Sequence, residues 1–529
     1  MHKRIELVLS PEEAAGEQHW MIPSSRKSGI PVNEIKAVVL HKRSIDARSK
    51  HVVVRLQVDV YSGDTPVENK ITERQLQNVS NGQPVIIIGC GPAGLFAALQ
   101  LIEKGFKPII IERGKDVKER RRDLAQLNKS RVVNADSNYC FGEGGAGTYS
   151  DGKLYTRADK RGNVKKVLDT FIQFGASPEI GIDAHPHIGT NKLPGIISAM
   201  RDAVLSCGGE VLFNCRFTGL LINNGTVAGI KYQSVAGTAS ETTIKSKMVI
   251  LATGHSARDI FEYLHNENIA IESKAFALGV RIEHPQGIID KVQYHCDVRD
   301  PFLPPAPYTL SSQANGRGVY SFCMCPGGII AAAATAPGEV VVNGWSPSKR
   351  NNPYANSGMV VSVDDEDFKP FEKEGELKAL RFQQSVEQAA FKSGGQNLTA
   401  PAQRMMDFIN GKNSSNLPSC SYIPGITPID LKEVLPKAVA EALKEGLKAF
   451  GTKMRGYATN EAVLVATESR TSSPVRIPRD KQTLMHPNLP GLFPCGEGAG
   501  YAGGIMSAAM DGERVAEACV AYNELKIRN

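Results

Sequence analysis

The chain has 529 residues, and at roughly 150 residues per domain this length predicts three or four structural units. Hydrophobic residues make up 41% and charged residues 22%, proportions that exclude a disordered chain and a small disulfide scaffold. The net charge is only +7, which does not indicate a polyanion-binding protein. The 50 glycines, close to one residue in ten, are the unusual feature of the composition.

The cysteines and the apolar runs bear on location. Ten cysteines are scattered without Cys-x-x-Cys spacing, so the sequence predicts neither a zinc ribbon nor a thioredoxin-type pair, and no metal site. No run reaches the roughly 18 apolar residues that a membrane helix needs, and residues 5–9 are too short for a signal-peptide core. We therefore expect a cytoplasmic protein that does not associate with membranes.

Residues 1–80 predict a small N-terminal α+β domain. Residues 5–9, 35–41 and 51–60 have the pattern of strands, and a helix is expected from Pro11 after a Ser10 cap. Residues 68–82 are polar and are expected to link this domain to the next. Basic residues at 41–43 and 48–51 raise the alternative of an RNA-binding domain, but few aromatic residues interleave with them. A solvated basic loop is therefore favoured, and nucleic acid is not expected as a partner.

A nucleotide-binding fingerprint follows the predicted strand 85–88. Gly89-x-Gly91-x-x-Gly94 opens a predicted helix, and Glu112-Arg113 ends the next strand. Gly89 permits a tight turn, Gly91 lets the backbone approach a pyrophosphate, and Gly94 allows close helix–strand packing. The N-terminus of the helix that begins at Pro92 and Ala93 offers the free N–H groups of its first turn, from Ala93 onward, to phosphates, and Glu112 can accept hydrogen bonds from a ribose.

Further glycine-rich clusters favour FAD over NAD as the cofactor. They lie at residues 141–154, 249–254 and 492–505, and together they resemble the FAD-binding domain of glutathione-reductase-like flavoproteins. The resemblance implies a discontinuous, Rossmann-like α/β domain, with four strands between 210 and 252 that resemble its β-meander. It places Ala252, Thr253 and Gly254 near the adenosine, Phe217 near adenine, Gly496 and Glu497 near the ribitol or pyrophosphate, and a helix from Gly504, Ile505 and Met506 toward the flavin pyrimidine. The remaining expected cofactor residues lie in the second cluster: Gly145, Ala146, Gly147, Thr148, Asp151 and Lys153, the last two expected to tune the isoalloxazine.

A closer resemblance covers most of the chain. The segments 144–154, 185–190, 354–358 and 470–476 resemble a family of uncharacterised bacterial FAD-dependent dehydrogenases. We expect an FAD-binding domain at 84–272 with a helical insertion at 156–205, a mixed α+β substrate domain at 273–460, and the C-terminal part of the FAD-binding domain at 461–529.

The absence of two motifs narrows the range of reactions that the flavin could carry out. No Cys-x-x-x-x-Cys pair stands at residues 144–147, which argues against a glutathione-reductase-type dithiol. No second Gly-x-Gly-x-x-Gly follows a strand, so an NAD(P)H electron donor would dock transiently in the substrate cavity. The basic run 115–122 could meet a phosphate, although a solvated helical face is favoured. Cys323-Met324-Cys325 would place two thiols on one face of a strand, which does not by itself make them reactive.

Candidate catalytic residues are few. His185 and His187 lie beside Asp183 and could act as acid or base, and Arg470 could bind an anionic substrate group. Packing roles are equally open for all three. The leading hypothesis is an FAD-dependent oxidoreductase, a dehydrogenase that transfers hydride between a small organic substrate and flavin N5. A flavin-dependent monooxygenase and an FAD-stabilised binding module are the alternatives, and the substrate, the direction of reaction and the oligomeric state stay open.

Overall fold

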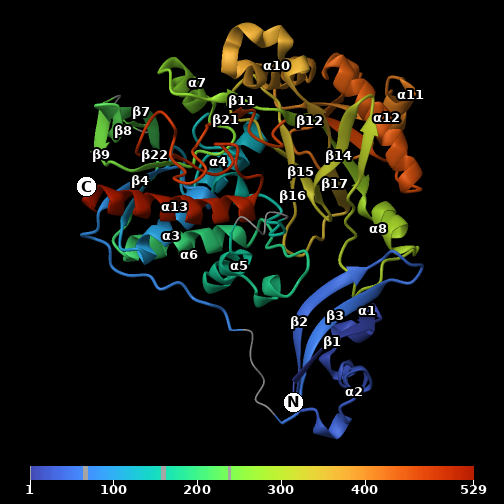
Figure 1. The fold of residues 1–529 in the computed structure, drawn as a ribbon. Helices are drawn as coiled ribbons and strands as arrows, with labels where there is room; N and C mark the ends of the chain where they lie inside the picture. Colours follow the sequence, from blue (N-terminus) through green and yellow to red (C-terminus); the bar gives the residue numbers. More distant parts are fainter. Residues whose placement is uncertain (1, 64–69, 157–161, 236, 238–239, 529) are drawn as a thin grey trace.

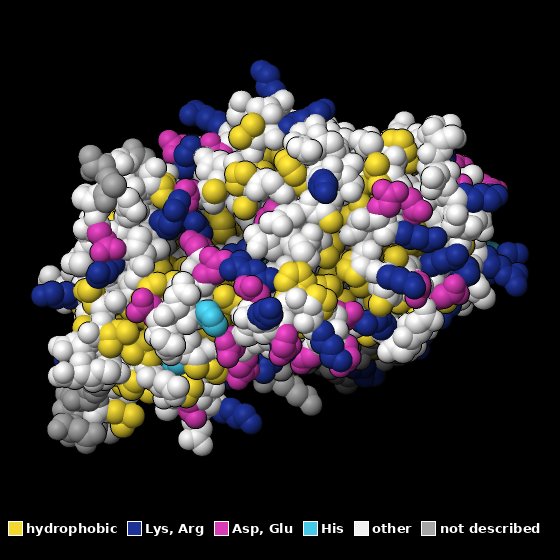
Figure 2. All heavy atoms as spheres, turned by 90° about the horizontal axis from the view of Figure 1, so that it is seen from above, with side chains coloured by type: hydrophobic (Ala, Val, Ile, Leu, Met, Phe, Trp, Pro, Cys, Tyr) yellow, Lys and Arg dark blue, Asp and Glu magenta, His cyan; other side chains and the backbone are white. Residues whose placement is uncertain are grey.

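A computed structural model describes residues 2–63, 70–156, 162–235, 237 and 240–528, with side chains up to residue 525. Figure 1 shows a small N-terminal sheet that projects from two larger parts lying side by side. Among the residues described, no helix combines the length and the apolar character needed to cross a bilayer. On the face in Figure 2, acidic and basic side chains are interspersed, with hydrophobic side chains between them.

The N-terminal unit is a three-stranded antiparallel sheet with strand order β1-β3-β2. Its strands are β1 (His2–Leu9), β2 (Ala37–Asp46) and β3 (Val53–Tyr61), and its helices are α1 (Pro11–Ala15) and α2 (Met21–Ser28). Ser10 caps α1 through the Glu13 N–H, as its position before Pro11 predicts. The sheet buries Leu56 and Val58 completely, and Trp20 at the start of α2 covers them.

Three arginines of this unit are paired with carboxylates. Arg43 in β2 exchanges backbone hydrogen bonds with residues 182 and 184, and its Nε lies 2.8 Å from Asp183 Oδ1. Arg48 and Arg55 both pair with Asp46 of the same unit. The contacts of Arg43 dock the edge strand β2 on residues 182–184, and the ion pairs neutralise Arg43 and Arg48 of the basic segments.

The segment after the N-terminal unit lies against the FAD-binding part. Residues 68 and 69 of the expected linker lie outside the described residues, whereas residues 70–83 are in place. Arg74 is buried and forms ion pairs with Glu103 and Glu513. The Thr72 N–H donates to Asp169 at 2.9 Å. Contacts of Thr72 and Arg74 therefore hold this stretch against the FAD-binding part.

The FAD-binding part has a five-stranded parallel sheet of order β22-β10-β4-β5-β6. Its strands are β4 (Pro84–Ile88), β5 (Lys107–Ile111), β6 (Glu210–Leu212), β10 (Val249–Leu251) and β22 (Leu492–Pro494). The associated helices are α3 (Pro92–Glu103), α4 (Val117–Ser130), α5 (Val164–Gln173), α6 (Leu193–Ser206), α7 (Arg258–Asn266) and α13 (Ile505–Arg528). Ile87 packs with α3, α6 and α13 on one face, and Ile86 packs with α7 and the meander on the other. Residues 157–161 of the expected insertion lie outside the described residues.

The meander differs from the expectation. It consists of β7 (Cys215–Asn223), β8 (Thr226–Ser234) and β9 (Glu241–Lys245), whereas β6 and β10, two of the four strands expected there, belong to the parallel sheet. The strand β9 is largely exposed and polar, so it has no apolar run to mark it in the sequence.

The second large part is built on a seven-stranded mixed sheet of order β13-β14-β17-β12-β20-β18-β19. Its strands are β12 (Phe276–Pro285), β13 (Ser311–Ala314), β14 (Arg317–Cys325), β17 (Tyr354–Val363), β18 (Ala400–Arg404), β19 (Ile426–Pro428) and β20 (Val463–Glu468), with the hairpin β15 (Ile329–Ala332) and β16 (Val342–Trp345) beside them; β11 (Glu272–Ser273) and β21 (Val475–Arg476) form a separate pair. The helices are α8 (Gln286–Tyr294), α9 (Asp365–Phe368), α10 (Lys378–Ser393), α11 (Met405–Asn410) and α12 (Lys437–Lys453).

The strand β20 lies in the middle of this mixed sheet, where it pairs with β12 and β18. The sequence places residues from 461 onward in the FAD-binding domain. The pairing of β20 instead carries the chain through the second large part up to Glu468, and we place the return at about residue 470.

Candidate active site

A cavity of about 1020 Å³ lies where the parallel sheet, α13 and the mixed sheet meet. Most of the expected cofactor residues line it: Gly89, Gly91, Pro92, Ala93, Glu112, Arg113, Gly145, Ala146, Gly147, Asp151, Lys153, Phe217, Ala252, Thr253, Gly254, Glu497, Gly504, Ile505 and Met506. Gly94, Thr148 and Gly496 are not among the lining residues. Thr309, Phe322 and Asn343 of the second large part line the same cavity.

The three fingerprint glycines have different surroundings. Gly89 has φ +105, and a Cβ there would lie 2.4 Å from the Ala252 carbonyl oxygen. A Cβ on Gly94 would lie 2.0 Å from the Gly89 oxygen, so this position needs glycine for helix–strand packing. A Cβ on Gly91 would have no neighbour nearer than 3.9 Å, because this residue faces the open cavity. Gly91 also caps α3 without a side-chain hydrogen bond, which leaves bare N–H groups at the cavity wall.

Glu112 is locked in place by main-chain donors. Its Oε1 accepts from the N–H groups of Gly114 and Gly142, and its Oε2 accepts from Cys90, each at 2.9 Å. A carboxylate oxygen has a second lone pair, so Glu112 can still accept from a ligand hydroxyl. The arrangement fits the ribose role that the fingerprint predicts.

The glycine-rich loop after residue 138 is fastened by Arg120. This side chain is fully buried and donates to the carbonyl oxygens of Asn138, Tyr139, Glu143 and Gly145 at 2.6–2.9 Å. Burial lowers the pKa of Arg120. The solvated face that the sequence favoured for residues 115–122 is therefore wrong at this position, because the loop carbonyls replace water around the guanidinium.

Thr148 belongs to the same fastening. Its Oγ1 donates to the Glu143 carbonyl at 2.7 Å, and Thr148 is completely buried. The residue holds the loop that carries η3 (Gly145–Gly147) and is turned away from the cavity. Thr148 therefore supports the loop from behind and does not line the cavity.

Asp151 and Lys153 connect the two large parts. Asp151 Oδ2 accepts from Arg350 at 3.0 Å, and Lys153 Nζ donates to the Met324 carbonyl. Burial opposes ionisation of Asp151, but Arg350 and Lys153 outweigh it, and the pKa of Asp151 is lowered. Asp151 is therefore an anion at neutral pH.

The turn after β10 presents an unpaired hydroxyl. Thr253 Oγ1 is buried, and among the described residues it has no hydrogen-bond partner. Gly254 has φ +73, and a Cβ there would meet nothing within 4 Å. An orphaned hydroxyl beside bare backbone is what a bound polar ligand would complete, so this turn fits the cofactor that the sequence predicts.

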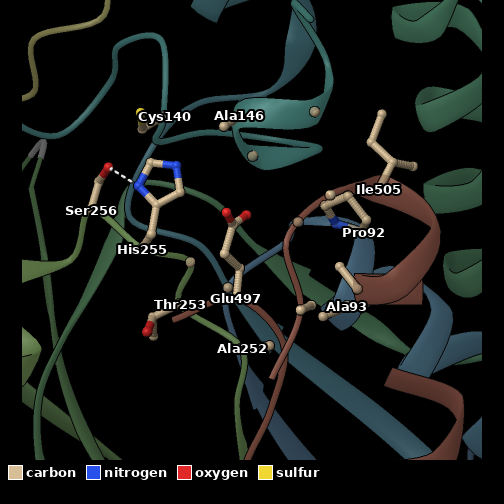
Figure 3. Close-up of a pocket in the computed structure, with 18 of the residues that line it drawn as sticks. Pro92, Ala93, Cys140, Ala146, Ala252, Thr253, His255, Ser256, Glu497 and Ile505 are labelled. Atoms are coloured by element: carbon tan, nitrogen blue, oxygen red, sulfur yellow. Dashed lines mark hydrogen bonds between the residues drawn. The ribbon is translucent and has the colours of Figure 1, made fainter. Parts of the chain in front are cut away.

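Glu497 points into the open space in Figure 3, between the turn at Ala252 and Thr253 and the segment around Ala146. Burial raises the pKa of Glu497 to about 7, against the attraction of Lys274. Its carboxyl group can therefore serve as donor or acceptor to a ligand near neutral pH. Beside it, Gly503 and Gly504 have no atoms within 4 Å of an added Cβ, so the N-terminus of α13 is open to the cavity.

His255 is a cavity residue that the sequence reasoning missed. Arg470 Nη1 donates to Ser256 Oγ at 2.9 Å, and Ser256 Oγ lies 2.7 Å from His255 Nδ1, the bond drawn in Figure 3. Arginine can only donate, so Ser256 Oγ accepts from Arg470 and is at the same time the hydrogen-bond partner of Nδ1. Burial and Arg470 lower the pKa of His255 to about 4, so the ring is a neutral N–H donor. The sequence signal that could have identified His255 is its position directly after the Ala252–Gly254 turn.

Arg470 lines the cavity but is not free to bind an anion. It is 5% exposed, and its Nη2 lies 2.9 Å from Glu387 Oε2 and 3.4 Å from Glu339 Oε2. Burial opposes ionisation of Glu387, but Arg258 and Arg470 outweigh it and lower the pKa of Glu387 to about 2. The carboxylates of Glu387 and Glu339 therefore compensate the charge of Arg470 within the protein.

His185 and His187 are not brought into the cavity. His185 contacts the Tyr155 ring edge-on at 5.0 Å, and His187 Nε2 lies 3.2 Å from the Ser348 carbonyl oxygen. Burial and Arg350 lower the pKa of His187 to about 4. Backbone bridges on either side, at Asp183 with Arg43 and at His187 with Lys153, hold this segment as a connector between the N-terminal sheet and the cofactor loop.

Comparison with known proteins gives the class. Residues 83–258 match an FAD binding domain, residues 275–471 match the family described as FAD-dependent protein, C-terminal domain-like, and residues 1–61 match a domain of unknown function. With Gly89 and Gly91 of the fingerprint lining one cavity, these matches define an FAD-dependent oxidoreductase. The cofactor is FAD.

The family follows from a relative that spans nearly the whole chain. An uncharacterized protein of Clostridium beijerinckii is 42% identical over 511 residues, which cover 93% of this chain and 94% of the relative. The chain therefore belongs to the same uncharacterised family of FAD-dependent proteins.

More distant similarities are partial. A thiamine thiazole synthase of Methanococcus maripaludis is 24% identical over 36% of this chain and 62% of its own length. A geranylgeranyl bacteriochlorophyll reductase-like protein of Thermoplasma acidophilum, of solved structure, is 15% identical over 84% of each chain, with a TM-score of 0.34.

Proposed function

We propose that this oxidoreductase is a dehydrogenase that transfers hydride between a small organic substrate and N5 of FAD. The observation that carries the proposal is the shared cavity, whose walls come from the FAD-binding part and from Thr309, Phe322 and Asn343 of the second part. Single small-molecule sites occupy about 300–1,000 Å³. A cavity of about 1020 Å³ therefore supports a cofactor with a small substrate beside it.

The residues proposed to act on ligands are those that line this cavity. Gly91, the N-terminus of α3 and Glu112 would hold the pyrophosphate and ribose, and Thr253 would bond the adenosine half. In this proposal Ser256 would donate to Nδ1, so that Nε2–H of His255 would donate to an oxygen of a bound ligand, and Arg470 would be the positioning residue that holds Ser256. His185 and His187 have no part in the proposal, because neither lines the cavity.

The electron donor belongs to the same proposal. One dinucleotide fingerprint is present and FAD uses it, so a nicotinamide would enter the substrate side of the cavity transiently. The free state of all ten cysteines supports the cytoplasmic location inferred from the sequence.

The test is anaerobic reduction of the FAD-bound protein. We expect bleaching of the flavin by NADH or NADPH, followed by reoxidation with an artificial acceptor or an organic oxidant, without oxygen. NAD(P)H oxidation that requires oxygen and yields a hydroxylated product would contradict the dehydrogenase and establish the monooxygenase. A salt-sensitive gel shift of the full chain with RNA would support the binding module instead.

A further inference from the structure

Two of the ten cysteines meet in the cavity wall. Cys323 and Cys325 close the strand β14, and the register of β14 against β17 shifts between Phe322 and Cys325. Cys323 has φ +44, a conformation that side chains other than glycine, asparagine and aspartate rarely adopt. Cys325 Sγ lies 3.3 Å from the Cys323 carbonyl oxygen and also hydrogen-bonds the Cys323 sulfur. Strained backbone of this kind persists where the surroundings enforce it, often at functional sites.

The two thiols have unequal access. Cys323 lines the cofactor cavity and is half-buried, whereas Cys325 is completely buried behind it. A ligand in the cavity can therefore reach the first sulfur directly and the second only through the first. This is the arrangement of an attacking thiol with a resolving thiol behind it.

Cations surround the pair. Arg281 is fully buried, and its Nη2 lies 2.7 Å from the Cys323 oxygen and 3.5 Å from Cys325 Sγ. The hydrogen bond from Cys325, with Lys153 and Arg281 nearby, lowers the pKa of Cys323 against the effects of burial and of Asp151; the carboxyl groups of Glu468 and Glu497 also face Cys323. By contrast, burial raises the pKa of Cys215 and of Cys296. Thiolates, not thiols, are the nucleophiles in exchange reactions.

We propose that Cys323 and Cys325 form a redox-active thiol pair that opens onto the flavin cavity and reacts with small disulfide compounds. The Cys323 thiolate attacks one sulfur of the disulfide, whose S–S bond breaks and releases one thiolate. Cys325 then attacks Cys323 Sγ, and the second thiolate leaves. The products are a Cys323–Cys325 disulfide and two small thiols, which carry the two protons of the cysteines. The pair is oxidised by two electrons and the small disulfide is reduced by two.

This site lies outside the glutathione-reductase-type position excluded from the sequence, because both thiols come from the mixed sheet. It is also independent of the proposed hydride transfer. A protein whose flavin is reduced normally but whose thiols do not pair would overturn this inference alone.

The experiment treats the FAD-bound protein with oxidised glutathione, blocks free thiols, and maps the peptides by mass. In the wild type we expect a Cys323–Cys325 disulfide. In Cys325→Ser we expect one glutathione per chain, trapped at Cys323, and in Cys323→Ser neither product. Cys296→Ser is the matched control and should pair as the wild type does. Modification of Cys323 no faster than Cys296, or glutathione trapped at another cysteine, would overturn the proposal.

A second measurement needs no variant and holds if Cys325→Ser fails to fold. As the pH is lowered from about 8 to 6, the alkylation rate of Cys296 should fall about tenfold for each pH unit, whereas that of wild-type Cys323 should fall less steeply. Parallel pH profiles for the two cysteines would refute the activated thiol.

Discussion

Adding one methyl group at Gly91 or at Gly94 should separate cofactor binding from folding. Gly91 has φ −79 and ψ −175, which alanine adopts readily, and its Cβ would enter open cavity space 3.9 Å from the nearest atom. Gly91→Ala should therefore leave the unfolding free energy of the apo-protein unchanged. If the pyrophosphate passes over this residue, the methyl group occupies its place, and overpacking of about 1–3 kcal/mol weakens FAD binding by about 5- to 150-fold.

Gly94→Ala should act on the fold instead. Its Cβ would lie 2.0 Å from the Gly89 carbonyl oxygen, a main-chain atom that cannot rotate away. We expect a loss of about 1–3 kcal/mol or more in the unfolding free energy of the apo-protein. Gly195→Ala, on α6 with nothing within 4 Å of the new Cβ, is the control and should leave both quantities near wild type.

The assays are titration of apo-protein with FAD, followed by flavin fluorescence, and urea unfolding without FAD. A wild-type Kd for Gly91→Ala would refute the path of the pyrophosphate over Gly91. Wild-type stability for Gly94→Ala would refute the close packing between β4 and α3.

Three further predictions concern the charged groups of the site. Arg470→Met leaves Glu387 and Glu339 with Arg258 as their ion-pair partner among the described residues, and should cost about 3–5 kcal/mol of stability in urea unfolding; a loss below about 1 kcal/mol would contradict the buried network. The pKa of Glu497 is raised from 4.5 to about 7, so the folded apo-protein keeps a proton that the unfolded chain releases, and stability should fall as the pH rises from about 4.5 to 7. Glu497→Gln should flatten that part of the profile, and an unchanged slope would exclude Glu497 as its source. Because the pKa of His255 is lowered to about 4, its NMR resonances should not titrate between about pH 6 and 8; a midpoint near 6.5 would contradict the neutral ring.

The fingerprint could be predicted because it is local. Strand, turn and helix follow one another over Val85–Glu103, and Gly94 is required by an atom only five residues away, the Gly89 carbonyl oxygen. The FAD-binding fold class and the cofactor followed from such clusters and are confirmed by the domain matches. The position of β20 did not follow, because its apolar run fits a parallel or a mixed sheet equally well.

The remaining site residues depend on contacts that are distant in sequence. His255 is held through Ser256 by Arg470, which follows β20 and lies more than 200 residues later in the chain. Arg120 stands among exposed basic residues of α4, and only the carbonyl groups of a loop about twenty residues later explain its burial. Neither the contact of Arg470 with Ser256 nor that of Arg120 with the loop can be inferred from the spacing of residues along the chain.

The parallel sheet of the FAD-binding part is completed by β22 and covered by α13, which both follow the mixed sheet in the chain. β4 lies between β5 and β10, and β22 covers the outer edge of β10. The helix α13 lies beside α3 (Figure 1). A Cβ on Gly512 of α13 would lie 2.1 Å from the Ala93 carbonyl oxygen. A nascent chain that has reached the mixed sheet thus exposes the edge of β10 and the apolar face of α3. The parallel sheet and the wall that α13 gives to the cofactor cavity are therefore complete only once β22 and α13 have been synthesised.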